Sequence, residues 1–231
     1  MPTPTLDWRS RHDPRSRAYA IRPHLAATPR VDRLWAPGKI LDQGAEGACV
    51  GYAWASEAMA DPVPVALERL AINHPATWEL FARFLYGMAR YLDEWPGTDY
   101  EGTSVLAGAK AAQNAGLLHT YRWAFGLDDV LDTVVQKGPV VLGTNWHADM
   151  YAPRNGILTP TGPVVGGHAY LVVGYRTTVP QLGGAPGAVI KNSWGKDWGE
   201  NGLATISLED LDTLLSQDGE ACVPTSRSYG R

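Results

Sequence analysis

Three short segments of the chain carry residues that together could break an acyl bond. Residues 43–49 read QGAEGAC and end in Cys49, one of only two cysteines in the sequence. Residues 166–175 read GGHAYLVVGY and place His168 at the start of an apolar stretch. Residues 191–199 read KNSWGKDWG and place Asn192 before two tryptophans. Cysteine, histidine and asparagine in this order suit a nucleophile, its base and the group that orients the base.

The position of Cys49 favours a reactive sulfur. An apolar face at helical spacing follows it from Val50 to Ala58, which predicts a helix that begins at the cysteine and stops before Asp61. The first turn of a helix carries partial positive charge and free N–H groups, which lower a thiol pKa below its usual value of about 8.5. We therefore expect a thiolate at Cys49 paired with a protonated His168.

These segments resemble the motifs of the papain-like cysteine peptidases. Members have Gln-Gly-x-x-Gly-x-Cys at the nucleophile, a His-Ala strand that ends in Val-Gly-Tyr, and Asn-Ser-Trp-Gly-x-x-Trp-Gly at the orienting asparagine. His168 follows Cys49 by 119 residues and Asn192 follows it by 143, against about 130–150 in the family. One such motif is weak support, but three in the right order are specific. The resemblance spans residues 31 to about 210.

The resemblance implies roles for two further side chains. The amide of Gln43 would join the backbone N–H of Cys49 as an oxyanion hole, and one such donor typically contributes a factor of about 10²–10³ to kcat. Trp194 would cover the contact between His168 and Asn192 and exclude water from it, which keeps that hydrogen bond strong.

Substrate-binding positions also follow from the resemblance. Gly47 would let the substrate backbone approach closely, because a side chain there would intrude on the cleft. Gly143 and Gly167 stand where the family often places side chains into the second substrate pocket, so we expect a roomier pocket. Asp99 and Tyr100 stand near the position of a substrate-binding glycine pair, which predicts altered peptide binding.

The resemblance implies a cysteine endopeptidase that hydrolyses peptide bonds through a thioester acyl-enzyme. Cys49 would attack the carbonyl carbon, and His168 would protonate the leaving amine and then activate water. An acyl transferase or a peptidoglycan peptide hydrolase could use the same residues on the same fold. A further alternative is a catalytically idle binding or structural particle protein, which the intact motifs disfavour.

The rest of the sequence predicts the elements that position these residues. Besides the helix at Cys49, helical patterns cover 80–91 with Thr77 as N-cap, 104–115 ending at Gly116, and 127–137. After residue 137 the period changes to two, and strands are expected at 140–144, 156–158, 168–175, 188–192 and 202–206. Helices followed by strands indicate the α+β class.

The resemblance gives this class an architecture, the papain-like two-lobe fold. A helical lobe at about residues 40–125 would face an antiparallel β-barrel-like lobe at about 126–231, with the active-site cleft between them. Both lobes belong to a peptidase domain at residues 31–231. The family's helical propeptide and usual disulfides have no counterpart in the sequence, which indicates a bacterial- or phage-type member.

Residues 1–30 form a basic, Pro- and Arg-rich extension. It holds six arginines against two aspartates, a charge of +4, while the remaining residues carry −8. A solvated tail is the simplest interpretation of such a charge run. The alternative hypothesis, based on the opposite charges, is an arm that lies across or beside the cleft.

Composition excludes several functional classes. The net charge of −4 gives no bulk attraction to nucleic acid or to anionic membranes, and no stretch is long and apolar enough to span a membrane. The histidines outside the motifs have no ligand spacing, so we expect neither a metal nor another cofactor. The expected partner is a peptide or protein substrate, and the chain is expected to be a monomer.

Cysteine usage points to a compartment. Two cysteines cannot form a disulfide framework when Cys49 is the nucleophile, and Cys222 is then structural. Glu46 stands where exported family members usually have a bridged cysteine. Because no signal peptide follows Met1, we expect a reducing location, either the cytoplasm or a virion or similar particle.

Overall fold

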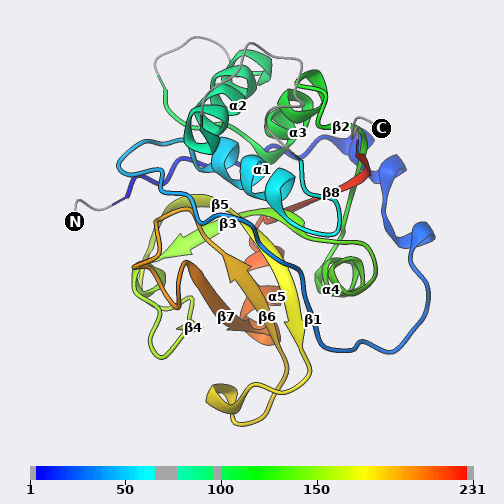
Figure 1. The fold of residues 1–231 in the computed structure, drawn as a ribbon, viewed down its shortest axis with the longest axis vertical. Coiled ribbons are helices and arrows are strands. Elements are labelled where there is room, and N and C mark those ends of the chain that lie inside the picture. Colours follow the sequence, from blue (N-terminus) through cyan, green and yellow to red (C-terminus); the bar gives the residue numbers. More distant parts are fainter. Residues whose placement is uncertain (1–3, 66–76, 96–99, 228–231) are drawn as a thin grey trace.

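A layer of three helices lies on one side of a β-sheet in the computed structural model, which describes residues 4–65, 77–95 and 100–227 (Figure 1). The helices are α1 (Cys49–Met59), α2 (Trp78–Leu92) and α3 (Val105–Asn114). Thr77 caps α2 by accepting a hydrogen bond from the Leu80 N–H, and Ser104 caps α3 in the same way. Gly116 follows α3 with φ of +74°, the left-handed conformation that ends many helices. The predicted cap and end are confirmed.

The sheet has eight strands and is open. They are β1 (Arg33–Leu34), β2 (Leu118–Trp123), β3 (Val140–His147), β4 (Ile157–Leu158), β5 (Val164–Arg176), β6 (Gly187–Lys191), β7 (Leu203–Ser207) and β8 (Glu220–Arg227). Their order is β2-β8-β3-β5-β6-β7-β4, and β1 pairs with β5. The β4–β7 pair is parallel and the others are antiparallel. The predicted α+β two-lobe fold is confirmed, and its barrel-like sheet is not closed, because the order leaves β2 and β4 at opposite ends of the sheet.

Both faces of the sheet are covered. On β5, Ala169 and Leu171 belong to the core that the sheet shares with α1–α3. Tyr170 and Val172 point to the other face and join the core beneath α4 (Leu127–Gln136) and α5 (Leu208–Ser216). Alternate side chains of a strand point to opposite faces, so a strand buried on both faces reads as a continuous apolar run. The run around His168 has this origin.

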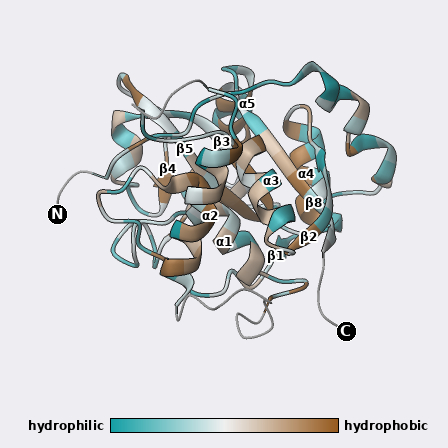
Figure 2. Cartoon of the chain, turned by 90° about the horizontal axis from the view of Figure 1, so that it is seen from above, coloured by the Kyte–Doolittle hydropathy of each residue, from teal (hydrophilic) through white to brown (hydrophobic). Residues whose placement is uncertain are grey.

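The sequence analysis missed β1, β2, β8 and α5. The burial of β2 does not alternate, since its four central residues are all exposed or half-exposed, so period-two patterning is absent there. Short 3₁₀ helices complete the chain: η1 (Pro14–Tyr19), η2 (Arg22–His24), η4 (Ala148–Tyr151) and η5 (Pro180–Leu182). Figure 2 shows hydrophilic residues along the outer segments and hydrophobic residues on the elements that face the interior.

The first part of the chain, residues 4–32, wraps around the molecule, and we call it the arm. From the N-terminus it runs between the helical layer and the sheet to the side of α4, and then returns to β1 (Figure 1). Arg22 bonds Asp129 and Asp132, and Arg30 bonds Asp132 at 2.7 Å and also Asp128. The basic arm thus lies on an acidic helix of the body.

No helix in the described segments is both long enough and apolar enough to span a membrane.

Candidate active site

Cys49 is the first residue of α1, and its side chain is fully buried. The helix is buried on every side, because it lies between α2 and β5. Gly51 permits this packing, since a side chain there would collide with the backbone of α2 at Ala82. The sulfur lies close enough to the backbone N–H of Ala169 for that group to affect its pKa. The fold therefore brings Cys49 to the residue that follows His168 on β5.

His168 is bonded to Asn192 inside the protein. Nε2 of His168 is 2.7 Å from Oδ1 of Asn192, and both side chains are buried. Because a carboxamide oxygen only accepts hydrogen bonds, this contact places the imidazole proton on Nε2. Nδ1 is buried and has no hydrogen-bond partner among the described residues. The imidazole therefore keeps a free acceptor for a proton from another group.

Aromatic rings surround this pair. The Trp194 ring lies over His168 with 4.7 Å between centroids and 34° between planes, and Trp146 meets the same imidazole edge-on at 4.7 Å. Tyr151 stacks on the other side of Trp194 at 5.3 Å. Trp194 is only 7% exposed, so the hydrogen bond between His168 and Asn192 lies in a dry environment.

Gln43 is buried beside the asparagine. Its Oε1 accepts a hydrogen bond of 2.7 Å from the Ser193 hydroxyl, which fixes the orientation of the amide. Its Nε2 donates to the Glu46 carbonyl at 2.8 Å and to the Thr5 carbonyl at 3.3 Å. The amide expected to hold an oxyanion therefore holds a carbonyl oxygen of the arm.

Residues 5–9, here the blocking segment, lie between β5 and the start of α3. The N–H of Trp8 donates to the Gly167 carbonyl at 2.9 Å. Thr103 donates its N–H to the Asp7 carbonyl at 3.2 Å, and its own carbonyl accepts from the Arg9 N–H at 3.1 Å. Trp8 and Thr103 thus form a parallel β-bridge. Backbone bonds to both lobes hold the segment in place.

The three glycines predicted to bind substrate all contact this segment. A side chain at Gly47 would collide with the Asp7 carboxylate, and side chains at Gly143 and Gly167 would collide with Trp8. The three glycines were predicted to let a substrate peptide approach closely. In this structure residues 7 and 8 of the same chain occupy the space next to them.

Burial opposes the predicted thiolate–imidazolium pair in the closed arrangement. Burial raises the pKa of Cys49 to about 11, although the backbone amides of Ala169 and Asp7 act to lower it. Burial likewise lowers the pKa of His168 to about 4, against the effect of its bond to Asn192. Between these values both groups are neutral. The prediction considered the helix terminus and the neighbouring imidazole but not the burial of both side chains.

The expectation of altered peptide binding at Asp99 and Tyr100 stays a prediction. Asp99 lies outside the described residues. Tyr100 bonds Asp93 through its hydroxyl at 2.6 Å and meets the blocking segment only through its ring, 4.6 Å from the Arg9 guanidinium. The backbone that binds the segment belongs to Thr103, three residues later, and Gly102 beside it has φ of +82°.

Four residues of the site escaped the sequence analysis: Trp8, Trp146, Ser193 and Glu220. Ser193 lies within the Asn-Ser-Trp motif and could have been found there. Trp8 donates a hydrogen bond from its indole N–H to Glu220, 212 residues away, at 3.2 Å. No local pattern announces such a contact, and the same holds for Trp146 against His168.

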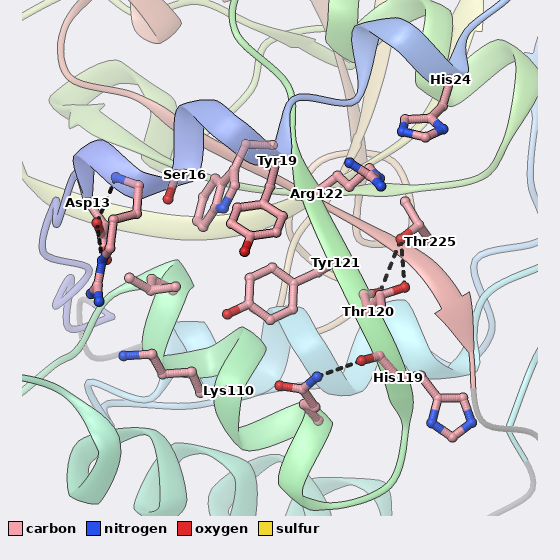
Figure 3. Close-up of a pocket in the computed structure, with 14 residues that line it drawn as sticks. Asp13, Ser16, Tyr19, His24, Lys110, His119, Thr120, Tyr121, Arg122 and Thr225 are labelled. Atoms are coloured by element: carbon pink, nitrogen blue, oxygen red, sulfur yellow. Dashed lines mark hydrogen bonds and ion pairs between the residues drawn. The ribbon is translucent and has the colours of Figure 1, made fainter.

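A separate cavity of about 650 Å³ lies between the arm, α3 and β2. Tyr19 and Tyr121 point into it from the arm and from β2 (Figure 3). It includes no residue of the catalytic set or of the blocking segment.

Cys49 and Cys222 are both free thiols. Among the residues with described positions, no cluster of three or more His, Cys, Asp or Glu side chains could hold a metal ion.

Comparison with known proteins shows what part of this chain is similar to. Residues 106–218, which include His168 and Asn192 but begin after Cys49, match the family described as "Papain family cysteine protease". A cathepsin B-like CP3 of Giardia intestinalis is 35% identical over 104 residues, which cover 42% of this chain and 34% of that protein. Cysteine proteinase B of Leishmania mexicana is 34% identical over 84 residues, or 36% of this chain and 18% of that protein. The chain spans about a third or less of these relatives.

Solved structures extend the likeness across the fold. Xylellain, a cysteine protease from Xylella fastidiosa, superposes with a TM-score of 0.60 at 18% identity, covering 99% of this chain and 95% of that one. Digestive procathepsin L 3 of Tenebrio molitor superposes with a TM-score of 0.61 at 16% identity, covering 87% and 71%. Residues 106–218 are thus similar in sequence to the papain family of cysteine proteases, and the α+β two-lobe fold of the chain is that of papain-like structures.

Proposed function

We propose that the chain is a cysteine endopeptidase that forms an acyl-enzyme on Cys49. His168 serves as base and acid, Asn192 orients its ring, and Gln43 helps to hold the oxyanion. The observation that supports this is the 2.7 Å contact between His168 Nε2 and Asn192 Oδ1. His168 lies on β5, the strand that packs against α1. It leaves Nδ1 as the acceptor for the cysteine proton.

The reaction begins once a peptide carbonyl replaces the blocking segment. The Cys49 proton moves to Nδ1 of His168, and the sulfur attacks the carbonyl carbon. The Gln43 amide, no longer bonded to Thr5, donates to the oxyanion together with the Cys49 N–H. His168 then gives its proton to the leaving amine as the C–N bond breaks. Water, deprotonated by His168, hydrolyses the thioester and restores the thiol.

We also propose that the blocking segment keeps the enzyme latent. It bonds Gln43 through Thr5, lies against Cys49 through Asp7, and fills the space at Gly143 and Gly167 with Trp8. A peptide or protein substrate must occupy the same space, so binding of the two is mutually exclusive. The enzyme would work as a monomer, since every catalytic group comes from one chain.

Alkylation and cleavage test the proposal in the full chain. Trp8→Ala removes the largest side chain of the blocking segment and should raise both iodoacetamide labelling of Cys49 and peptide cleavage by at least about tenfold, because loss of a buried Trp costs several kcal/mol in the closed state. Cys49→Ala in that background should abolish cleavage, while Cys222→Ala should retain it. Equal labelling of both cysteines, or cleavage that survives Cys49→Ala, rejects the proposal.

Product analysis separates hydrolysis from acyl transfer. With an added amine acceptor, a hydrolase should still release the free acid as its main product. A dominant amide product would assign the same residues to a transferase instead.

A further inference from the structure

We propose that the outer edge of β2 is a second peptide-binding site, which takes an extended segment with an aromatic residue between two acidic residues. The occupant is a segment of another protein that adds to the sheet as a further strand. The site goes beyond the proposed function, because the cavity beside this edge is lined by no residue of the catalytic set or of the blocking segment. Binding there therefore requires no activity of Cys49.

The backbone of Tyr121 is available for such a strand. β2 ends the sheet order, and Trp123 turns its carbonyl outward to accept the N–H of Ile21 from the arm at 2.8 Å. Tyr121 lies two residues earlier without a register shift between them, so its N–H and carbonyl also point outward. Its neighbour on β8 is Pro224, which has no N–H to donate. Within the described segments neither group of Tyr121 has a hydrogen-bond partner.

The arm leaves this part of the edge open. It meets β2 in a parallel bridge between Ala20 and Trp123. If the arm stayed extended, Ala18 would lie beside Tyr121, but residues Pro14–Tyr19 form the 3₁₀ helix η1 instead. The cavity of about 650 Å³ occupies the space between η1, α3 and β2. Its volume lies within the range of about 300–1,000 Å³ that binding pockets have.

The side chains of β2 give the two sides of this edge different chemistry. Tyr121 leaves one side of the strand, whereas Thr120 and Arg122 leave the other (Figure 3). Tyr19 of the arm points into the cavity together with Tyr121. Aromatic rings pack well edge-on or offset against one another. The residue of an added strand that pairs with Tyr121 points to the same side, so an aromatic residue suits that position.

The lining of the cavity is cationic. It contains three basic residues and one acid, which are Arg15, Lys110, Arg122 and Asp13. Asp13 is bonded to Arg15 at 2.6 Å, and Lys110 is bonded to Glu94 at 3.3 Å. Arg122 has no ion pair with any residue that the structure describes. The residues on either side of the aromatic one point to the side of Arg122, where acidic side chains complement its charge.

The test uses the full chain with Cys49→Ala, so that no peptide is cleaved. Titration calorimetry measures the Kd of the unlabelled peptide acetyl-Gly-Glu-Phe-Glu-Gly-amide at low salt. We expect a Kd at least about tenfold lower than with Lys in place of both Glu residues, because that change puts like charges beside Arg122. It should also be at least about fivefold lower than with Ala in place of Phe, which removes the ring between the tyrosines. Equal affinity for the three peptides would overturn the proposal.

Methylation of the peptide backbone tests strand addition itself. The N–H groups of an added strand point alternately toward β2 and away from it. One peptide carries a methyl group on the Phe nitrogen, and a second carries methyl groups on both Glu nitrogens. One of the two should lose affinity by at least about tenfold while the other keeps it, because only one set of N–H groups bonds β2. Equal loss or equal retention would overturn the proposal.

Variants and hydrogen exchange locate the bound peptide. Tyr19→Ala and Arg122→Glu should each raise the Kd at least about fivefold, and Tyr19 is 57% exposed, so its replacement leaves the core intact. Arg154→Glu, at an exposed arginine before β4, is the matched control and should leave the Kd unchanged. The peptide should slow amide exchange in residues 118–123.

The two proposals fail separately. Slowed exchange at Thr103 and Gly167, with none at residues 118–123, would place the peptide in the catalytic cleft and overturn the second site. No measurement in this series depends on cleavage, so an inactive Cys49 would remove the peptidase and leave the edge site standing. The peptide series needs no change in β2, so it decides the matter even where Arg122→Glu does not fold.

Discussion

At the scale of single residues, the site is assembled from short motifs and distant contacts. The spacing of the motifs was enough to single out Cys49, His168 and Asn192, because each stands in a pattern that can be read within ten residues. Their protonation was not predictable in the same way. The pKa of a buried thiol depends on the groups packed around it, and here these include Ala169 and Asp7, which lie far from Cys49 in the sequence.

The pH dependence of alkylation follows from this. With the blocking segment in place, the pKa of Cys49 is raised to about 11, so its thiol is neutral at pH 7 and the thiolate fraction grows about tenfold per pH unit. The iodoacetamide rate at Cys49 in the wild-type chain should keep rising up to about pH 11. In Trp8→Ala water reaches the sulfur, and the rate should level off at a lower pH. Identical profiles measured by mass spectrometry would contradict the role given to burial.

At the scale of elements, local signals located the helices well and the sheet less completely. Thr77 and Gly116 mark their helix ends through side-chain and backbone chemistry that the sequence displays. The sequence also gave apolar runs for β3, β5 and β6, which are buried on both faces. No apolar run marks β2, because its exposed residues are polar. The sequence also does not indicate whether the sheet is open or closed. Strand order depends on which backbones pair, and that is not written in the local pattern.

Lys191 on β6 offers a test at this scale. Its Nζ donates to the carbonyls of Pro37 and Lys39 at 2.5 and 2.8 Å and is buried there. The element therefore fastens the chain that leads from β1 to Gln43. Burial lowers the pKa of Lys191 to about 7.

Above about pH 10.5 the amine is neutral in both states. As the pH falls from there to about 7, the unfolded chain takes up the proton first, and folding loses stability until both states are charged.

Relative to Lys191→Met, the wild-type free energy of unfolding should therefore rise between pH 7 and 10.5, by on the order of a few kcal/mol. Urea unfolding at several pH values measures it, with Lys196→Met, an exposed neighbour, as control. A difference curve that is flat across this window would show that Lys191 is charged in the folded protein.

At the scale of the whole molecule, the charge imbalance between the two ends of the sequence has a structural counterpart. The sequence indicated either a solvated tail or an arm near the cleft, and residues 5–9 lie beside Gln43 and Gly167, as the second hypothesis expects. Arg22 and Arg30 hold the arm to α4, and both bond Asp132. Burial alone would raise the pKa of Asp132, but the bonds from Arg30 and Arg22 outweigh it and hold that pKa below its usual range.

Asp132→Ala should loosen the arm without touching the catalytic residues. Partly exposed ion pairs contribute about 0.2–1 kcal/mol each, so losing two should shift the arm toward the open state and raise peptide cleavage about two- to tenfold. High salt should have the same direction of effect in the wild type and little further effect in the variant. Asp212→Ala, an exposed acid on α5, provides the comparison in both assays. Unchanged rates in Asp132→Ala would mean that the clamp on α4 does not control access to Cys49.

The pairing of Leu34 with Gly174 anchors the end of the arm to the strand that carries His168. Any excursion of residues 5–9 is therefore made on a tether, and the segment returns to its own site at an effective concentration of about millimolar magnitude. Dilution cannot separate residues 5–9 from their site on the same chain, so the latency of the enzyme is independent of its concentration. A single cut in the exposed stretch between Arg11 and Ile21 would turn inhibition into an encounter between two molecules, and activity would then climb as the solution is diluted.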